Sequence, residues 1–468
     1  MDTAQAAEAV FKTRILPVKT TNLGDFDQLT RLEKWELPRD QDIIQPLQQA
    51  AELLKKSNIP VGFPTETVYG LGADATRSDA VKGIYKAKGR PLDNPLIVHV
   101  CDLSMLRELL APAGQTNGHS ASAPNPNPNP IPQIYWPLIM KFWPGPLTIL
   151  LPNPRPSKLA PEVTAGLPTF GARMPQSPLA LSLIKLAGVP LAAPSANAST
   201  KPSPTTAEHV LHDLDGRIEI ILDGGTCQVG VESTVVDGLC NPPIVLRPGG
   251  VSIDQLRECE GWECVVKGYK DASELGSTTP RAPGMKYKHY SPKAKVVLFE
   301  ATLQPATKPA TSLGAGPLST SDGQVPHIDL ELLGRPARIG IVRTRHWDKW
   351  AGFHHAPDET QDRSTTTHVT SSHDYPQNTS SQLRMGKLWQ SGSRKTGSQS
   401  TEGRHLADII EISLGSETKD IAHGLFSVLR ELDQRNVDVI YVEGIEDEGD
   451  IAAAVMNRLR KAASIVED

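Results

Sequence analysis

The sequence IPVGFPTETVYGLG, residues 59–72, decides the fold of the first half of the chain. Its first part, Ile59–Phe63, predicts a short buried strand because the run is apolar and brief. The part that follows, Pro64–Gly72, packs two threonine hydroxyls, a carboxylate and two glycines into one turn. Such a turn can bring backbone N–H groups and hydroxyls close to a small polar ligand, although an ordinary strand exit can have the same composition.

Helix and strand patterns alternate on both sides of this turn. Apolar residues at helical spacing predict a helix over Ile43–Leu54, and Ser78 is a candidate N-cap for a helix that ends near Lys86. Further strands are expected at residues 96–100, 147–151, 169–174, 190–193, 218–222, 233–236 and 244–246, and further helices at 103–110, 135–142, 179–187 and 205–214. The alternation predicts an α/β domain with a largely buried mixed sheet.

The 468 residues are enough for two or three domains. We expect an irregular N-terminal extension over 1–40, a catalytic α/β domain over 41–262, a linker over 263–292 and a second α/β domain over 293–468. The second domain has strand patterns at 295–299, 338–342, 408–412 and 437–442, and helix patterns at 418–432 and 449–463. Two low-complexity inserts, at 111–132 and about 345–405, are predicted to be disordered because their polar sequence cannot form a core.

Composition and charge exclude several classes of protein. The net charge of −5 provides no strong global field for nucleic acid, so a phosphate site must be local. The five cysteines form no C-x-x-C pair, which argues against a disulfide framework and a zinc site. No apolar run approaches the roughly 18 residues that span a bilayer. The N-terminus lacks the apolar segment of a signal peptide, so we expect a cytoplasmic protein without a membrane partner.

Three cations occupy alternate positions in the stretch KAKGRPLDNP, residues 86–95. In an extended segment Lys86, Lys88 and Arg90 would project to the same side and could face one polyanion. A triphosphate needs such an arrangement because the charge on its oxygens must be neutralised, and arginine adds bidentate recognition. A solvated basic loop is the alternative interpretation.

Two further polar residues lie within predicted strands. His99 interrupts the apolar run 96–100, where it is either a ligand-binding group or a hydrogen-bonded core histidine. Arg173 comes late in the strand 169–174, where an arginine can clamp a carboxylate or form a surface ion pair.

The stretch AAPSAN, residues 192–197, carries the next polar cluster and is followed by Ser199, Lys201 and Ser203. Ser195 and Asn197 follow a predicted strand, and ligands of open α/β sheets bind beyond the carboxyl ends of strands. The absence of G-x-S-x-G disfavours a hydrolase nucleophile, so Ser195 is expected beside a phosphate or a metal, with a plain loop as the alternative. The sequence also lacks a Walker A motif, a G-x-G-x-x-G beside a strand and a kinase H-R-D.

Taken in order, these clusters resemble the YrdC family. The motifs P-T-E-T-V-Y-G-L-G, K-A-K-G-R-P-x-D-N-P-L-I-V-H, F-W-P-G-P-L-T, R-x-P, P-S-A-N-x-S, V-E-S-T-V-V and R-P-G follow one another between about Ile43 and Leu256. The linker MKYKHYSP, residues 285–292, and the second domain resemble the two-domain threonylcarbamoyl-AMP synthases. The resemblance implies a twisted mixed sheet with flanking helices and a central cavity, plus a smaller C-terminal Rossmann-like α/β domain. The two inserts depart from the compact form of the family.

The resemblance also implies which residues bind substrates. The threonine pocket would be lined by Thr67, His99, Arg173, Ala193 and Ser233, with Arg173 on the amino acid carboxylate. ATP would be surrounded by Lys88, Arg90, Asn94, Thr169, Ser195, Asn197, Ser203, Arg247 and Tyr290, with Tyr290 as a lid from the linker. Mg²⁺ would be held mainly through ATP, so no metal site made of protein alone is implied.

The activity implied by the resemblance is that of a nucleotidyltransferase. It would join L-threonine, bicarbonate or CO2, and ATP into L-threonylcarbamoyl-AMP and release pyrophosphate. The product would pass to a complex that transfers the threonylcarbamoyl group to tRNA, and direct tRNA binding would be weak. The second domain offers only Glu443 and Gly444 as candidate site residues, with a plain strand end as the alternative. We expect this domain and its linker to gate the active site.

Three other functions fit parts of the sequence. A non-enzymatic RNA-binding module would use the cations of residues 86–90, but the net charge of −5 weakens that hypothesis. A carbamoyl-adenylate enzyme of hydrogenase maturation would carry a related domain together with paired C-x-x-C zinc motifs, which are missing. A scaffold with a dead active site would be expected to have lost some of the cationic positions, and all are present.

Overall fold

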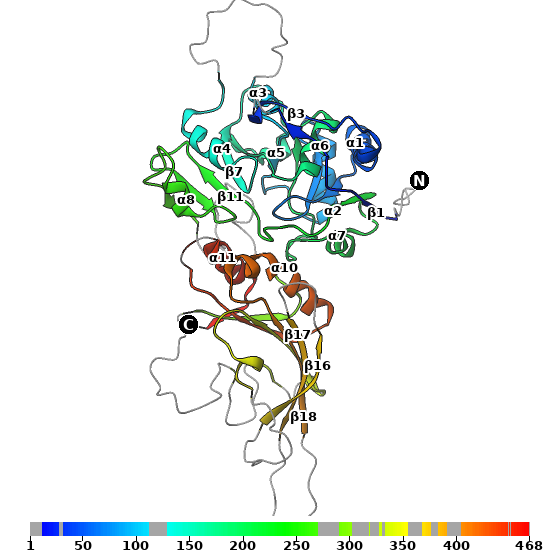
Figure 1. Ribbon diagram of the computed structural model, residues 1–468, viewed down its shortest axis with the longest axis vertical. Coiled ribbons are helices and arrows are strands. Elements are labelled where there is room, and N and C mark those ends of the chain that lie inside the picture. Colours follow the sequence, from blue (N-terminus) through cyan, green and yellow to red (C-terminus); the bar gives the residue numbers. More distant parts are fainter. Residues whose placement is uncertain are drawn as a thin grey trace, which may run out of the picture. The chain divides into compact units, whose positions relative to one another are not determined.

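The computed structural model describes residues 12–27, 31–111, 129–269, 290–301, 318, 327–329, 333–353, 367–375, 382–390, 404–447, 449 and 451–467. The chain divides into two compact units (Figure 1). The first consists of Met1–His289 with Gly449–Ala454, and the second of Tyr290–Glu448 with Val455–Asp468. Most of the insert predicted at 111–132 lies outside the described residues, as does most of the linker.

The first unit is built on an 11-stranded mixed sheet of order β1-β10-β4-β5-β9-β6-β8-β7-β11-β12-β13. Its strands are β1 (Arg14–Pro17), β4 (Val61–Phe63), β5 (Gly70–Asp74), β6 (Ile97–His99), β7 (Leu147–Pro152), β8 (Thr169–Arg173), β9 (Leu191–Ala192), β10 (Ile220–Asp223), β11 (Thr234–Asp237), β12 (Ile244–Arg247) and β13 (Val266–Lys267). A small separate sheet pairs β2 (Asp25–Phe26) with β3 (Trp35–Glu36).

Helices flank this sheet (Figure 1). They are α1 (Gln45–Lys56), α2 (Ser78–Lys88), α3 (Leu103–Leu110), α4 (Trp136–Phe142), α5 (Pro161–Thr164), α6 (Pro178–Ala187), α7 (Ala207–Leu214) and α8 (Ile253–Arg257). Helix α1 buries Leu47, Ala50, Ala51 and Leu54, the face that the helical spacing predicted. The α/β class and the mixed sheet expected from the sequence are therefore confirmed.

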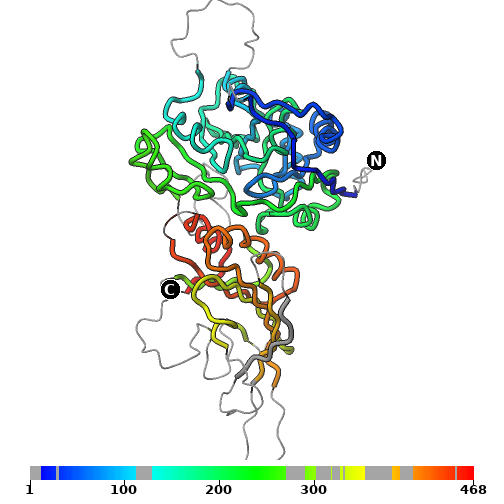
Figure 2. Tube along the Cα trace, in the orientation of Figure 1, coloured from blue at the N-terminus to red at the C-terminus, as the bar shows by residue number. Residues whose placement is uncertain are grey.

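The prediction of an irregular N-terminal extension over 1–40 is wrong for the residues described there. Strand β1 pairs in parallel with β10 at the edge of the main sheet, and Figure 2 follows this blue segment across the first unit. The Thr13 hydroxyl donates to the Ile218 carbonyl at 2.6 Å, and the Trp35 indole donates to the Ser182 hydroxyl at 2.8 Å. Thr13 and Ile218 are 205 residues apart in the chain, so a local pattern could not reveal this pairing.

The prediction of an extended K-A-K-G-R segment is also wrong. Helix α2 runs on through Lys88 and ends at Gly89, which adopts φ = 62° and closes the helix as only glycine does readily. Ser78 is the first residue of α2, and Arg77 occupies the N-cap position. Residues two apart in a helix point to different sides, so Lys88 is buried while Lys86 is exposed. The two lysines cannot face one ligand together.

The second unit contains a seven-stranded sheet of order β16-β17-β18-β15-β19-β14-β20. Its elements are β14 (Lys295–Phe299), β15 (Ala337–Arg343), β16 (Thr367–Tyr375), β17 (Gln382–Gln390), β18 (Arg404–Ser413), α10 (Thr418–Gln434), β19 (Val439–Glu443), α11 (Ala452–Ala462) and β20 (Ile465–Glu467). Strands β18, β15, β19, β14 and β20 run parallel, as in a Rossmann-like sheet.

The prediction that residues from about 345 to 405 are disordered is wrong in part. Strand β17 pairs antiparallel with β18, and β16 pairs antiparallel with β17. Leu383 and Leu388 of β17 are buried against the sheet. The polar residues around β17 hid this strand, because a Ser- and Gly-rich stretch carries little of the alternation that identifies a strand.

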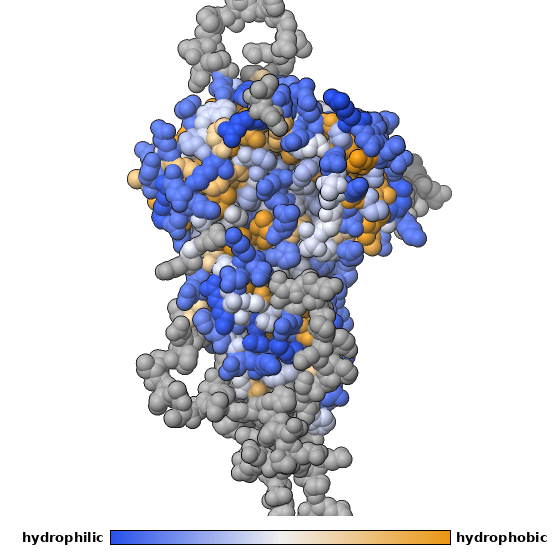
Figure 3. All heavy atoms as spheres, in the orientation of Figure 1, coloured by the Kyte–Doolittle hydropathy of each residue, from blue (hydrophilic) through white to orange (hydrophobic). Residues whose placement is uncertain are grey.

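The described surface carries few large apolar side chains. Charged and polar residues predominate on the face drawn in Figure 3, with apolar ones scattered among them. The exposed large apolar residues are Leu92, Met140, Leu239, Val266 and Val466. Within the part of the chain that the structure describes, no helix is both long and apolar enough to cross a membrane.

Glu443, a candidate site residue of the second unit, is fully engaged by backbone amides. The Thr344 N–H donates to its Oε2 at 2.6 Å, and the Trp347 N–H donates to its Oε1 at 2.8 Å. The His346 N–H donates to the same Oε1. Glu443 is buried and lies at the carboxyl end of β19, where it holds the loop that follows β15. These contacts favour the structural interpretation of a strand end.

We predict that Glu443→Gln destabilises this loop, because an amide supplies one acceptor oxygen where three N–H donors converge. Losing hydrogen bonds to a buried charged group costs about 2 kcal/mol, which corresponds to roughly 30-fold faster exchange of the protected amides. Hydrogen exchange of peptides covering 344–353 measures the effect. Glu446→Gln, at a largely exposed carboxylate, is the matched control. Equal exchange in the two variants would show that the carboxylate does not hold the loop.

Candidate active site

The loop Pro64–Tyr69 holds the site together through its backbone. On one side the Ala196 N–H donates to the Tyr69 carbonyl at 2.8 Å, and the Tyr69 N–H donates to the Pro204 carbonyl at 2.9 Å. On the other side the Gly230 N–H donates to the Thr67 carbonyl at 3.1 Å. The loop therefore contacts both the P-S-A-N segment and the segment before β11. Six residues extend at most about 20 Å, so these segments lie within the length of a substrate.

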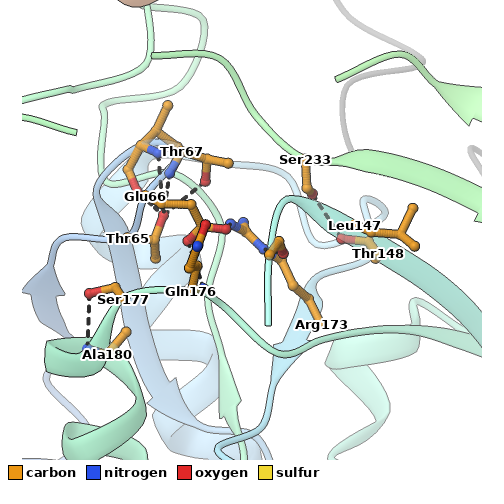
Figure 4. Close-up of polar contacts among 12 residues, drawn as sticks. Thr65, Glu66, Thr67, Leu147, Thr148, Arg173, Gln176, Ser177, Ala180 and Ser233 are labelled. Carbon is orange, nitrogen blue, oxygen red and sulfur yellow. Dashed lines mark hydrogen bonds and ion pairs between the residues drawn. The ribbon is translucent and has the colours of Figure 1, made fainter. Parts of the chain in front are cut away.

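A buried ion pair joins this loop to the sheet (Figure 4). Glu66 Oε1 lies 2.6 Å from Arg173 Nη2, and both side chains are at most 5% exposed. The other carboxylate oxygen of Glu66 accepts from the Gln176 N–H at 3.0 Å, and Arg173 Nε donates to the Gly145 carbonyl at 3.2 Å. These contacts fix the guanidinium through Nε and Nη2, whereas Nη1 has no hydrogen-bond partner among the described residues. The surface ion pair considered for Arg173 is excluded.

His99 lies beside Arg173, because β6 and β8 are parallel and the two residues are register partners. The His99 ring is buried, and its Nδ1 has no hydrogen-bond partner among the described residues. Desolvation, assisted by the Arg173 charge, lowers the pKa of His99 to about 3. The imidazole is therefore neutral near pH 7, and within the described part of the chain its Nδ1 lacks a partner, which suits a polar ligand better than a satisfied core histidine.

The hydroxyls of the loop are oriented by their hydrogen bonds. Thr65 Oγ1 donates its one hydrogen to the Val68 carbonyl at 2.7 Å. It also accepts from the Thr67 N–H at 3.2 Å and the Val68 N–H at 3.3 Å, and Thr67 Oγ1 lies 2.8 Å away from it. The Thr67 hydroxyl is thus held in place, and its oxygen could accept a hydrogen bond from a ligand.

Ser233 forms the opposite wall, just before β11 (Figure 4). Its Oγ lies 2.8 Å from Thr148 Oγ1 of β7. Arg247 of β12 donates from Nη2 to the Ser233 carbonyl at 2.9 Å and to Ser233 Oγ at 3.1 Å. Since β7 is antiparallel to β8 and parallel to β11, these residues lie at the same edge of the sheet as Arg173.

A second cluster surrounds Lys88 at the end of α2. Lys88 Nζ donates to the Ser195 carbonyl and, at 2.6 Å, to the Asn197 carbonyl. Ser195 Oγ donates to Asn197 Oδ1 at 2.6 Å. Nearby in the chain, Ser203 Oγ donates to the buried carboxylate of Glu232 at 2.6 Å. Backbone carbonyl, hydroxyl and amide oxygens of residues 195–197 thus lie next to the buried Lys88.

The hydrogen bonds within this cluster leave oxygen lone pairs that suit a hard metal ion. Both amide hydrogens of Asn197 are used, at 2.8 Å by the Ala198 carbonyl and at 2.9 Å by the Lys201 carbonyl. The Ser195 hydroxyl donates its hydrogen to Asn197 Oδ1, so the lone pairs of Ser195 Oγ remain available to a ligand. Mg²⁺ prefers such oxygen ligands and binds through few of them plus substrate phosphates. Among the described residues no group of three His, Cys, Asp or Glu could hold a metal ion.

Comparisons with known proteins show the family of this chain. Residues 52–249 match the family model described as "Telomere recombination", and residues 251–464 match the one described as "Threonylcarbamoyl-AMP synthase, C-terminal domain". The threonylcarbamoyl-AMP synthase of Schizosaccharomyces pombe is 41% identical over 90% of this chain and 88% of that protein. The synthase of Bacillus subtilis is 39% identical over 89% of this chain and 92% of that protein.

The chain belongs to the threonylcarbamoyl-AMP synthase family. The crystal structure of Pyrococcus abyssi Sua5 complexed with L-threonine resembles it with a TM-score of 0.62 at 33% identity. The match covers 97% of this chain and 100% of that one, so it includes both units. The fold class expected from the sequence is therefore confirmed for the two-domain form of the family.

Most of the predicted site residues lie in the first unit. Beyond those already placed, Arg90 donates to the Pro95 carbonyl at 3.3 Å, and Asn94 is buried with an Oδ1 that has no partner in the described structure. Ala193 donates its N–H to the Ile97 carbonyl at 2.9 Å. Thr169 is half-buried at the start of β8.

Tyr290 is the predicted residue that belongs to the second unit. Its ring is buried and stacks on Phe426 with the centroids 5.1 Å apart, and the Arg458 guanidinium lies 5.8 Å from its centroid. A lid role over the nucleotide stays a prediction.

Sequence reasoning missed three polar residues of this site. Glu66, Thr148 and Glu232 all lie inside motifs that the sequence singled out, but none was assigned a role. Their contacts involve partners that are distant in the chain, since Glu66 and Arg173 are 107 residues apart. A carboxylate inside an otherwise apolar and hydroxyl-rich motif was the available signal, because a buried carboxylate requires a partner.

We predict that His99 weakens the folded state at acid pH. Its pKa falls from about 6.5 in the unfolded chain to about 3 in the folded protein, so the unfolded chain binds the proton first as the pH drops. Stability contributed by the neutral ring is present above pH 6.5 and is lost toward pH 3, by up to about 1.4 kcal/mol per pH unit. Denaturant titrations from pH 7 to pH 4.5 should show a shallower loss for His99→Asn than for wild type. Parallel pH curves would contradict a neutral buried imidazole.

Proposed function

We propose that this protein synthesises L-threonylcarbamoyl-AMP from L-threonine, bicarbonate or CO2, and ATP, and releases pyrophosphate, for the threonylcarbamoyladenosine modification of tRNA next to the anticodon. One observation carries the proposal. The loop Pro64–Tyr69 links the Arg173 guanidinium to the segment that surrounds Lys88, within the length of a substrate. The guanidinium suits an amino acid carboxylate, and the buried lysine with its neighbouring oxygen atoms suits a triphosphate and its metal ion.

The residues of the threonine side match the charged and polar groups of the substrate. The Nη1 edge of Arg173 would bind the substrate carboxylate, while Thr67 Oγ1 would accept a hydrogen bond from the substrate amine. His99 is neutral and adds no charge that would repel the amine. Ser233 would close the pocket from β11. This arrangement orients the amine and leaves it able to react.

The ATP side consists of Lys88, Ser195 and Asn197, with Arg90 and Arg247 on its flanks. Lys88 would compensate phosphate charge, and the lone pairs of Ser195 Oγ would face Mg²⁺, while Asn197 Oδ1 holds the Ser195 hydroxyl in this orientation. The metal, when bound with ATP, supplies positive charge to the phosphate oxygens. The protein residues hold the triphosphate in a fixed orientation toward the threonine side.

The reaction then requires placement more than covalent catalysis. The neutral amine and bicarbonate form the carbamate with loss of water. A carbamate oxygen attacks the α-phosphorus, the new O–P bond forms, and the bond to the β-phosphate oxygen breaks as pyrophosphate leaves. Holding the reactants in register is worth about 7–11 kcal/mol in favourable cases, which matters most for an unstable carbamate.

We propose that the second unit and the linker gate this site, with Tyr290 covering the nucleotide. The stacking of Tyr290 on Phe426 ties this end of the linker to the second unit. The product would be handed to a tRNA-modifying complex in the cytoplasm. Direct tRNA binding is not required for the synthesis.

We predict that pyrophosphate release requires all three substrates. Purified protein with ATP, Mg²⁺, bicarbonate and L-threonine should release pyrophosphate, and omission of threonine or bicarbonate should abolish the release. Release without threonine, or no release, would overturn the proposal. In that case steeply salt-dependent RNA binding would favour the RNA-binding alternative.

We predict unequal effects of two neighbouring lysines. Lys88→Met should lower kcat/KM for ATP by about a hundredfold, because it removes the buried cation of the phosphate cluster. Lys86→Met, on the exposed side of the same helix, should change it by no more than about twofold. Steady-state kinetics with ATP varied gives both values. Equal losses of kcat/KM in the two variants would indicate that both lysines face the same ligand.

A further inference from the structure

We infer that Asp213 of α7 is the positioning residue of the ATP side, which acts by holding the loop 198–201 and through it the amide of Asn197. Asp213 lies outside the motifs that identify the site. The inference rests on the proposed function, because it assigns a second layer to the proposed triphosphate cluster.

The first step is the contact between Asp213 and the loop. Its Oδ2 accepts from the Ala198 N–H at 3.2 Å, and its Oδ1 lies 3.1 Å from Lys201 Nζ. The Asp213 side chain is fully buried, whereas that of Lys201 is 30% exposed. His212 on the same helix places Nδ1 3.1 Å from the same Oδ1. A buried carboxylate therefore pins both ends of this short loop.

The second step leads from the loop to Asn197. The Ala198 and Lys201 carbonyls accept both hydrogens of the Asn197 amide. An amide whose two hydrogens are both used cannot rotate without losing both bonds. Asn197 Oδ1 is thereby directed toward Ser195 Oγ at 2.6 Å and Lys88 Nζ at 3.4 Å. The orientation of the proposed phosphate ligands thus depends on the loop that Asp213 holds.

The third step is the conformation of the loop itself. Thr200 adopts φ = 76°, a region that residues with a β-branched side chain rarely occupy. Such a conformation persists only where surrounding contacts enforce it. The Ser199 N–H also donates to the Lys88 carbonyl at 2.8 Å, so the loop connects α7 to the end of α2. Without the Asp213 contacts the loop would relax and release the Asn197 amide.

The test compares two isosteric substitutions, one within α7 and one at the residue that caps its C-terminus. Asp213→Asn removes the charge that holds Lys201, and Asp215→Asn makes the same chemical change at an exposed position two residues later. Binding of α,β-methylene ATP with Mg²⁺, and of L-threonine, is measured by calorimetry on the full chain. We expect Asp213→Asn to weaken binding of the nucleotide by about ten- to hundredfold and to leave threonine binding within about twofold, with Asp215→Asn like wild type.

A second variant separates the loss of the ion pair from a general folding defect. Lys201→Met removes the other partner of the ion pair from the less buried side and should weaken nucleotide binding selectively. The double variant should be no weaker than Asp213→Asn alone, because both changes break one contact. Additive losses would overturn the inference.

Two other outcomes would also overturn it. Unchanged nucleotide binding in Asp213→Asn would show that Asp213 does not position the ATP side, and the proposed function would still stand. Equal weakening of both ligands together with a lower Tm would show that Asp213 only stabilises the fold. If wild type binds no nucleotide at all, the proposed function fails as well, so the two failures are distinguishable.

Discussion

The buried ion pair between Glu66 and Arg173 is the constraint on which the site depends. Taking two charges out of water costs several kcal/mol per ion, and the cost is offset only when the remaining polar atoms are also satisfied. Here Gln176 and Gly145 supply the additional hydrogen bonds. The pair therefore has one stable geometry, which sets both the loop Pro64–Tyr69 and the guanidinium that faces the proposed carboxylate.

The loop Pro64–Tyr69 also fixes the residues proposed to bind the phosphates. Its backbone bonds to Ala196 and Pro204 fix the P-S-A-N segment, and the contact of Asp213 with the loop 198–201 fixes that segment from behind. Two clusters of opposite chemistry are thus held in register before any substrate arrives. Preorganised groups cost no reorganisation during reaction, which suits a reaction whose main difficulty is to bring three reactants together.

Much of the fold followed from local pattern. Apolar spacing identified α1 and α3, and collinear motifs supplied most of the proposed site residues, because helix faces and strand exits are encoded within a few neighbouring positions. The failures have physical causes. Strand β1 depends on a partner about two hundred residues away, and β17 lies within a polar stretch. The K-A-K-G-R segment was given the wrong periodicity, since Gly89 ends the helix later than expected.

The sequence by itself determined the α/β class, the family and the kinds of groups available for chemistry, because composition, periodicity and motif order are properties of the chain. Only the tertiary structure decided how those groups are used. Burial made His99 neutral, paired Glu66 with Arg173 and separated Lys86 from Lys88. It also brought in Asp213, which no motif contains. Protonation, hydrogen-bond direction and desolvation depend on neighbours in space, and the chain order does not state which residues those are.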